Sequence, residues 1–283
     1  MPETGVIHDI GYQRYEGPRL GPGHSARSLY VHSLRSAYGL GRSPWAKVLP
    51  IGLVGLASIA SLVLVIINSQ LPAPIIDHVG IASAFTYAAT VFVAVVAPEL
   101  VSTDLRTKLL QLYLSRPLSR SSYALTKVAA LATATWGLFA APMLIMFLGS
   151  AFTADGVGGV LEEFGGLLVG LLAAAVHAAL LAALGLPIAS LSGRRVFATG
   201  MIIAVFLLTA PVAAILRALG AGPAAGLLDP TSLLNGVDVW LFGSDIDLIG
   251  GTGSLGPVFA VTAVALTALG TVAAVLRYKG VKS

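Results

Sequence analysis

The apolar residues of the chain stand in long blocks and do not alternate with polar residues. Ala, Leu, Val, Ile and Gly dominate these blocks. A helix that crosses the hydrocarbon core of a bilayer needs roughly 20 consecutive apolar residues. Six blocks reach this length, near 48–67, 79–97, 126–150, 165–191, 196–217 and 257–277. The pattern predicts an all-α integral membrane protein, with an N-terminal region over 1–47 and a six-span transmembrane domain over 48–283.

The charged residues sort to the two sides of these spans. All of the 17 Lys and Arg except Arg217 lie in the N-terminal region, in the connections after spans two and four, or in the C-terminal tail. The other connections carry most of the acidic residues: Asp77, Asp155, Glu162, Glu163, Asp229, Asp238, Asp245 and Asp247. The positive-inside rule makes the basic side cytoplasmic. We therefore expect both termini inside, in a multi-pass protein of the bacterial cytoplasmic membrane.

The amino-acid composition limits the kinds of functional site that this chain can form. Only 11% of the residues are charged, and the chain has no cysteine, so neither disulfides nor thiolate metal sites are available. The sequence contains no G-x-x-x-x-G-K-[ST] phosphate loop, no H-E-x-x-H and no G-x-S-x-G. We expect no catalytic, cofactor-binding or metal-binding residues in this chain, and any ATP-driven work would need a partner.

His177, in span four, is the single ionisable residue that we expect between the ends of the spans. It could bind a proton, or it could be a neutral histidine hydrogen-bonded to a neighbouring helix, and the second interpretation is favoured. Ion-coupled carriers usually need carboxylates at membrane depth. No span shows one, which counts against a secondary carrier.

An amphipathic segment, near residues 26–40, precedes span one. Tyr30, Leu34 and Tyr38 fall on one apolar stripe, and Arg35 lies off it. We expect an elbow helix in the inner interface of the membrane. The Tyr- and Arg-rich stretch over 8–21 either packs against a cytoplasmic partner or is a flexible basic tail.

The connection between spans two and three, over 98–127, contains a second amphipathic pattern. Ser102 and Thr103 are expected N-caps of a short helix that ends at Arg116-Pro117. Its leucines share one face with a tyrosine while its basic residues point elsewhere, as follows: Leu105, Leu109, Leu112 and Tyr113, against Arg106 and Lys108. The helix either rests on anionic headgroups or acts as a coupling helix in a cleft of an ATPase.

The connection over 218–256 contains LLDPTSLLNGVDVWLF at 227–242, which is too apolar for a solvated loop and too short to cross. We expect one or two short extracellular helices that dip into the outer leaflet. The alternative is a helix packed on the outer ends of the spans. Pairs of small residues, Gly166 with Gly170 and Gly270 with Ala274, predict close helix approach without naming a dimer interface.

These features together resemble the ABC-2 family of ABC transporter permeases. The resemblance rests on the six spans, the elbow segment and the loop from Glu99 through Asp104, the Leu-rich run 109–115 and Arg116-Pro117-Leu118-Ser119-Arg120 to Lys127. The stretch HDIGYQRYEGPRLG at 8–21 also resembles the tail of bacterial permeases in this group.

The resemblance implies an exporter built from two permeases, as a homodimer, and two ATP-binding subunits that hold ATP and Mg. Residues 102–115 would contact the ATPase, through Asp104, Leu105, Arg106, Leu109, Leu112, Tyr113 and Arg116. Glu99 would fix the end of span two, or would be a solvated or Arg-paired acid. We expect an amphiphilic or hydrophobic substrate of the drug, antibiotic or lipid class, and no nucleic acid partner. The alternative is a secondary carrier or channel that has no ATPase.

Overall fold

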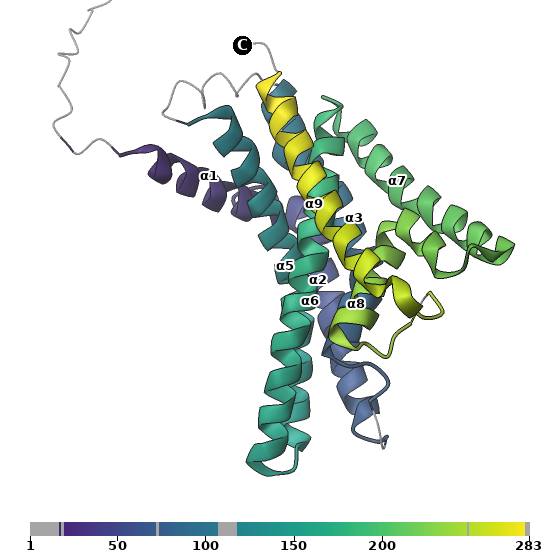
Figure 1. The fold of residues 1–283 in the computed structure, drawn as a ribbon. Helices are drawn as coiled ribbons and strands as arrows, with labels where there is room; N and C mark the ends of the chain where they lie inside the picture. The colour runs from purple at the N-terminus through teal and green to yellow at the C-terminus, as the bar shows by residue number, and fades with distance from the viewer. Residues whose placement is uncertain (1–16, 18–19, 72–73, 107–117, 248, 281–283) are drawn as a thin grey trace, which may run out of the picture.

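The computed structural model describes residues 17, 20–71, 74–106, 118–247 and 249–280, and all regular structure in these ranges is helical (Figure 1). Six helices are long and apolar enough to cross a membrane. They are α2 (Pro44–Asn68), α3 (His78–Arg106), α5 (Arg120–Thr153), α6 (Gly156–Ser190), α7 (Arg195–Leu216) and α9 (Gly256–Lys279). The six predicted spans are therefore present.

Three helices extend furthest beyond the predicted apolar blocks: α3, α5 and α6, which have 29, 34 and 35 residues. A turn at Gly156, whose φ is 71°, joins α5 and α6 into a hairpin. Hydrophobicity located the spans, whereas the helix ends depend on caps. Ser119, for example, accepts a hydrogen bond from the backbone N–H of Ser122 at 3.0 Å and starts α5.

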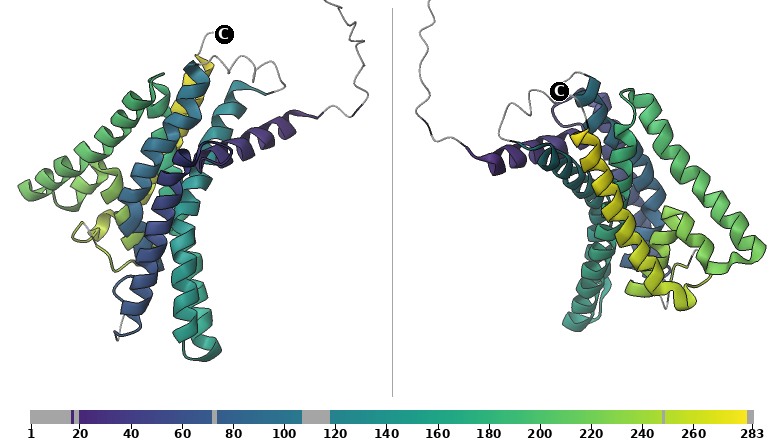
Figure 2. Two further views of the ribbon diagram at one scale, coloured as in Figure 1. Left: turned by 180° about the vertical axis from the view of Figure 1, so that it is seen from behind. Right: turned by 45° about the horizontal axis from the view of Figure 1, so that its top comes forward.

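α3 is the central helix of the bundle, between α5, α6 and α7 (Figures 1 and 2). In its apolar stretch 67% of the residues are buried, against 17% in α2 and in α7. A helix that is apolar on all sides is suited to such a central position. Much of the apolar surface of α2, α7 and α9 remains uncovered within the chain, including Leu56, Leu208 and Val264.

The basic connections gather at one end of the bundle, which we call the basic end. There Arg120 donates to the carbonyl of Lys279 at 2.9 Å, and Arg277 donates to the carbonyl of Ser190 at 3.3 Å. These carbonyls lie at the C-terminal ends of α9 and α6, where the negative end of the helix dipole favours cations. The opposite end, which carries the turn between α5 and α6, we call the hairpin end.

α1 (Pro22–Ala37) lies across the bundle rather than along it (Figure 2). The hydroxyl of Tyr30 donates to Thr133 Oγ1 at 2.8 Å, and that of Tyr38 donates to the carbonyl of Ala134 at 2.7 Å, both on α5. Leu34 is half-buried and Arg35 is exposed, while the fully buried positions of α1 are Leu29, Ser33 and Ala37. Burial raises the pKa of Tyr38 to about 12, so its phenol stays protonated and keeps this bond.

The connection between α7 and α9 folds back on the bundle. A π-helical turn (Arg217–Ala221) and a 3-10 helix (Gly222–Leu228) lead into α8 (Pro230–Phe242), and a last 3-10 turn (Gly253–Leu255) precedes α9. Asp229 caps α8 by accepting from the backbone N–H of Ser232 at 2.8 Å, and Gly243 ends it with φ 70°. The expected short helices therefore exist, and α8 packs on α9 and α3.

Glycines allow the closest helix contacts. A Cβ at Gly170 would lie 2.9 Å from the carbonyl oxygen of His78, and one at Gly270 would lie 2.3 Å from that of Ala183. These small residues therefore join α6 to α3 and to α9 within one chain.

This packing predicts that Gly270→Ala destabilises the protein by about 1–3 kcal/mol, because the added methyl group meets backbone atoms that cannot move aside. Gly55→Ala is the matched control, since a Cβ at Gly55 meets nothing within 4 Å. The measurement is the denaturation midpoint of each variant in detergent. Equal midpoints for the two variants would show that the α6–α9 contact is looser than the structure has it.

Candidate functional site

The basic end is held together by Glu99, near the end of α3. Its Oε2 contacts Arg42, in the turn between α1 and α2, and its Oε1 contacts Arg195, at the start of α7, both at 2.5 Å. The Glu99 side chain is only 8% exposed, whereas the arginines are 43% and 52% exposed. We call these three residues the Glu99 junction. Of the interpretations open from the sequence, the structure gives Glu99 the Arg-paired geometry.

The Glu99 junction links three separate parts of the chain through one carboxylate. A poorly solvated carboxylate needs cationic partners, and removing them leaves an uncompensated charge. The side chains of Arg42 and Arg195 therefore fix the α1–α2 turn and the start of α7 to α3.

Lys127 adds a further contact at this end. Its side chain is buried, and Nζ donates to the carbonyl of Leu100 on α3 at 2.8 Å and lies over the ring of Tyr123. The lysine expected at the opening of span three thus joins α5 to α3.

A cavity of about 800 Å³ opens between α1 and the ends of α3 and α5. Arg27, His32 and Arg35 of α1 line it, together with Arg42, Glu99 and Lys127. Cations outnumber the single carboxylate, which itself is paired. The cavity therefore suits an acidic group of a partner.

The predicted coupling residues divide into two groups. Asp104, Leu105 and Arg106 belong to the last turn of α3, which runs on without a break, so no new helix begins at Ser102 or Thr103. That N-cap prediction is wrong, because nothing in the sequence between Leu100 and Arg106 interrupts α3. Leu109, Leu112, Tyr113 and Arg116 lie outside the described residues.

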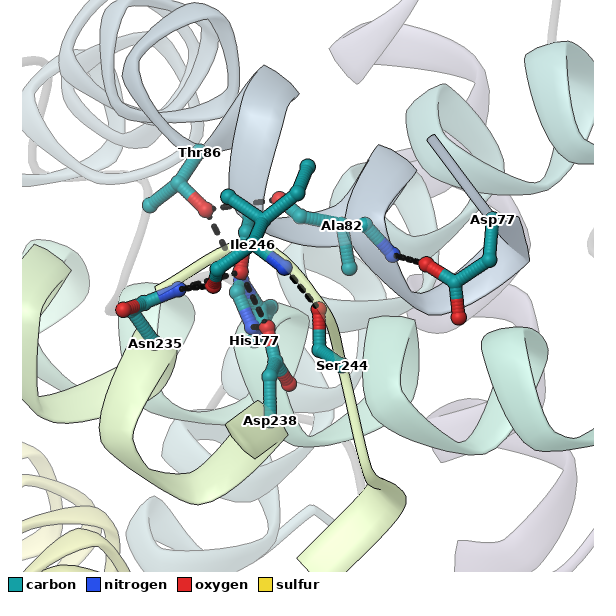
Figure 3. A network of polar contacts seen from close by, with 10 residues as sticks. Asp77, Ala82, Thr86, His177, Asn235, Asp238, Ser244 and Ile246 are labelled. Carbon is teal, nitrogen blue, oxygen red and sulfur yellow. Dashed lines mark hydrogen bonds and ion pairs between the residues drawn. The ribbon is translucent and has the colours of Figure 1, made fainter. Parts of the chain in front are cut away.

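A second polar site lies deep between α3, α6 and α8 (Figure 3). His177 Nε2 is 2.9 Å from Asp238 Oδ2, and His177 Nδ1 is 2.9 Å from Thr86 Oγ1. Ser83 donates to the same carboxylate oxygen at 2.6 Å. The side chains of His177 and Asp238 are both fully buried. We call Ser83, Thr86, His177, Asn235 and Asp238 the buried polar cluster.

Asn235 ties the cluster to the segment after α8. Its side-chain amide donates to Ser83 Oγ at 3.1 Å and to the carbonyl of Ile246 at 2.7 Å (Figure 3). The ring of Phe139, on α5, packs edge-on against His177. Three helices and the segment after α8 thus meet at one buried ionisable pair.

The cluster differs from what the sequence predicts. His177 contacts side chains of two neighbouring helices, and one of these partners is a carboxylate that the sequence analysis places in an extracellular connection. Asp238 was missed because it lies outside the six apolar blocks. The available signal was a polar pair, Asn235 and Asp238, three residues apart in an apolar helical run and hence on one face.

The chemistry open to the cluster is proton binding and charge pairing. In the described part of the chain no three His, Cys, Asp or Glu side chains gather in a way that could hold a metal ion. The chain matches no protein-family model, and no curated protein matches its sequence.

The cluster predicts strong coupling between His177 and Asp238. His177→Leu and Asp238→Leu should each destabilise the protein by about 3–5 kcal/mol, because each leaves its partner polar, buried and unpaired. The double variant removes both groups and should lose clearly less than the sum. Denaturation of all four proteins in the same detergent measures the coupling, and additive losses would show that the two groups do not interact.

Proposed function

We propose that this chain is the membrane-spanning permease subunit of an ATP-driven ABC exporter. It would move an amphiphilic or hydrophobic substrate out across the cytoplasmic membrane, while a separate subunit binds Mg and hydrolyses ATP. Six apolar helices and the gathering of the basic connections at one end support a multi-pass protein of this kind. The ABC-2 resemblance of the sequence supports the family.

The observation that carries the proposal is the Glu99 junction. The predicted coupling segment follows Glu99 directly in the chain, and the junction joins α3 to Arg42 and Arg195. A push on the coupling segment would therefore reach α3, the turn after α1 and the start of α7 together. Such a linkage is what a permease needs in order to convert closure of ATP-binding subunits into helix movement.

Two features of the surface suggest the partners of this chain. The basic cavity beside α1 suits an acidic patch on each of two ATP-binding subunits, and the uncovered apolar faces of α2, α7 and α9 suit lipid and a second copy of the permease. The scarcity of polar groups on these faces favours a substrate that itself partitions into the bilayer.

A secondary carrier without an ATPase is a second candidate, and the His177–Asp238 pair favours it. Buried ionisable pairs at membrane depth mark proton relays in transporters. From the sequence, a carrier was disfavoured because no carboxylate was expected near His177, and Asp238 supplies one.

Co-purification separates the two candidates. The tagged protein, expressed with its neighbouring genes, should bring down a soluble subunit that contains a phosphate loop. Leu109→Asp with Leu112→Asp should lose that subunit and stay inserted in the membrane, because the charges disrupt an apolar docking face. A protein that purifies alone and transports when only a pH gradient is imposed would replace the exporter with the carrier.

The junction gives a sharper test. In the assembled complex, Arg195→Gln should lower substrate-stimulated ATP hydrolysis severalfold while ATPase binding persists, since α7 is no longer tied to Glu99. Arg194→Gln is the matched control, because Arg194 is adjacent and lies over Phe197 instead. Equal stimulation in the two variants would remove the junction from the coupling path.

A further inference from the structure

The hydrogen bonds of the buried polar cluster fix where its protons lie, starting from Asn235. Both N–H groups of its amide are directed to acceptors, Ser83 Oγ and the carbonyl of Ile246. Ser83 therefore accepts from Asn235 and donates its own hydroxyl proton to Asp238 Oδ2. The remaining contact of Oδ2, to His177 Nε2, needs a proton from the pair itself.

The other side of the imidazole needs a second proton. The hydroxyl of Thr86 lies 2.7 Å from the carbonyl of Ala82, which can only accept, so Thr86 donates there. The same oxygen lies 2.9 Å from His177 Nδ1 and must then accept from an N–H. His177 and Asp238 thus share two protons, one more than a neutral histidine and a carboxylate hold.

We propose that His177 and Asp238 form a reversible proton-binding site, and that its proton-loaded form fixes α8 to α3 and α6. With two shared protons the pair has no net charge, whether it is written as imidazolium with carboxylate or as imidazole with carboxylic acid. This inference concerns a ligand, the proton, that the export proposal does not include, and it does not depend on that proposal.

Loss of one proton has a definite structural cost. The pair then carries one negative charge at a place with no solvent exposure. Thr86 must turn its hydroxyl from Ala82 to Nδ1 to keep a hydrogen bond to the ring. Asp238 Oδ1 is buried and has no hydrogen-bond partner among the described residues, so nothing further in them stabilises the charge.

No other described ionisable group on the surrounding elements contacts this site. Glu162 of α6 and Asp245, after α8, are exposed, and the others contact different groups. Asp77, just before α3, accepts from the backbone N–H of Gly80. On α3, His78 faces Glu163 of α6, and Glu99 pairs with Arg195 of α7. On α5 and α9 the cations lie at the basic end, and Asp229 caps α8. Asp247, after α8, accepts from the backbone N–H groups of Ile249 and Gly250.

The buried polar cluster affects α8 because the polar contacts of α8 with α3 and α6 are concentrated in this cluster. Asp238 binds His177 of α6 and Ser83 of α3, and Asn235 adds a second bond to Ser83. Leu233, Leu234 and Val237 supply apolar contact on the same buried helix. Release of the proton weakens the polar tie and leaves α8 to depend on this apolar contact.

Hydrogen exchange tests the proposal on the full chain in detergent, with no ATPase present, so its outcome is separate from that of the exporter tests. Protection of the α8 amides, corrected for intrinsic exchange, should fall as the pH rises. A segment that opens with release of one proton becomes up to about tenfold easier to open per pH unit. Amides in the middle of α5 should not follow this dependence.

Two variants make the test specific. Asp238→Asn should make α8 protection independent of pH, because the amide cannot join in holding the second proton. Thr86→Val removes the acceptor of Nδ1–H and should shift the fall in protection to lower pH. Thr135→Val is its matched control, since Thr135 is buried on α5 and donates to the carbonyl of Leu131, within its own helix.

Protection of α8 that is flat with pH in the natural protein would overturn the proposal. So would a pH dependence that survives Asp238→Asn unchanged. If Asp238→Asn does not fold, the comparison of Thr86→Val with Thr135→Val takes its place, and an equal shift in both variants would also overturn the proposal.

Discussion

A carboxylate removed from water must be surrounded by cations and hydrogen-bond donors. This chain has two such carboxylates, and its helix arrangement depends on both. At the basic end, Glu99 is held by two arginines from distant segments. In the interior, Asp238 is held by a histidine and a serine from two different helices. Apolar contact alone would not fix the positions of α7 and α8 along their neighbouring helices, because hydrophobic packing is not directional. The two carboxylates fix their positions.

Much of the fold could be predicted from the sequence because bilayer-spanning helices depend on a simple property, the length of apolar blocks. All six were located, whereas the fully buried positions of α1 are Leu29, Ser33 and Ala37 and not the Tyr30, Leu34 and Tyr38 of the predicted stripe. Helix ends were less accessible, since Ser102 and Thr103 resemble caps yet lie inside α3. The partners of His177 were out of reach for a physical reason: α8 approaches α6 only after the chain reverses at Gly220 and Gly222, both with positive φ. No local sequence pattern specifies which helix the chain packs against after such a reversal.

The two sites divide the molecule by solvent access. The Glu99 junction lies beside a basic cavity and has half-exposed arginines, so a binding partner or salt can act on it directly. The buried polar cluster is enclosed by α3, α5, α6 and α8, so only a species as small as a proton can change its charge without unpacking the helices. An external partner would thus act on α7 through the Glu99 junction, whereas the local pH would act on α8 through the buried polar cluster.

The unequal helix lengths have a consequence for the surface of the membrane. With a rise of about 1.5 Å per residue, α5 and α6 are roughly 50 Å long, whereas α2 and α9, with 25 and 24 residues, measure under about 40 Å. A bilayer whose hydrocarbon core is about 30 Å thick fits the shorter pair. The α5–α6 hairpin then stands out among the headgroups and beyond, as its projection in Figure 1 illustrates. Near its tip Phe152 is 90% exposed, so the projecting part of the hairpin presents an apolar ring to its surroundings.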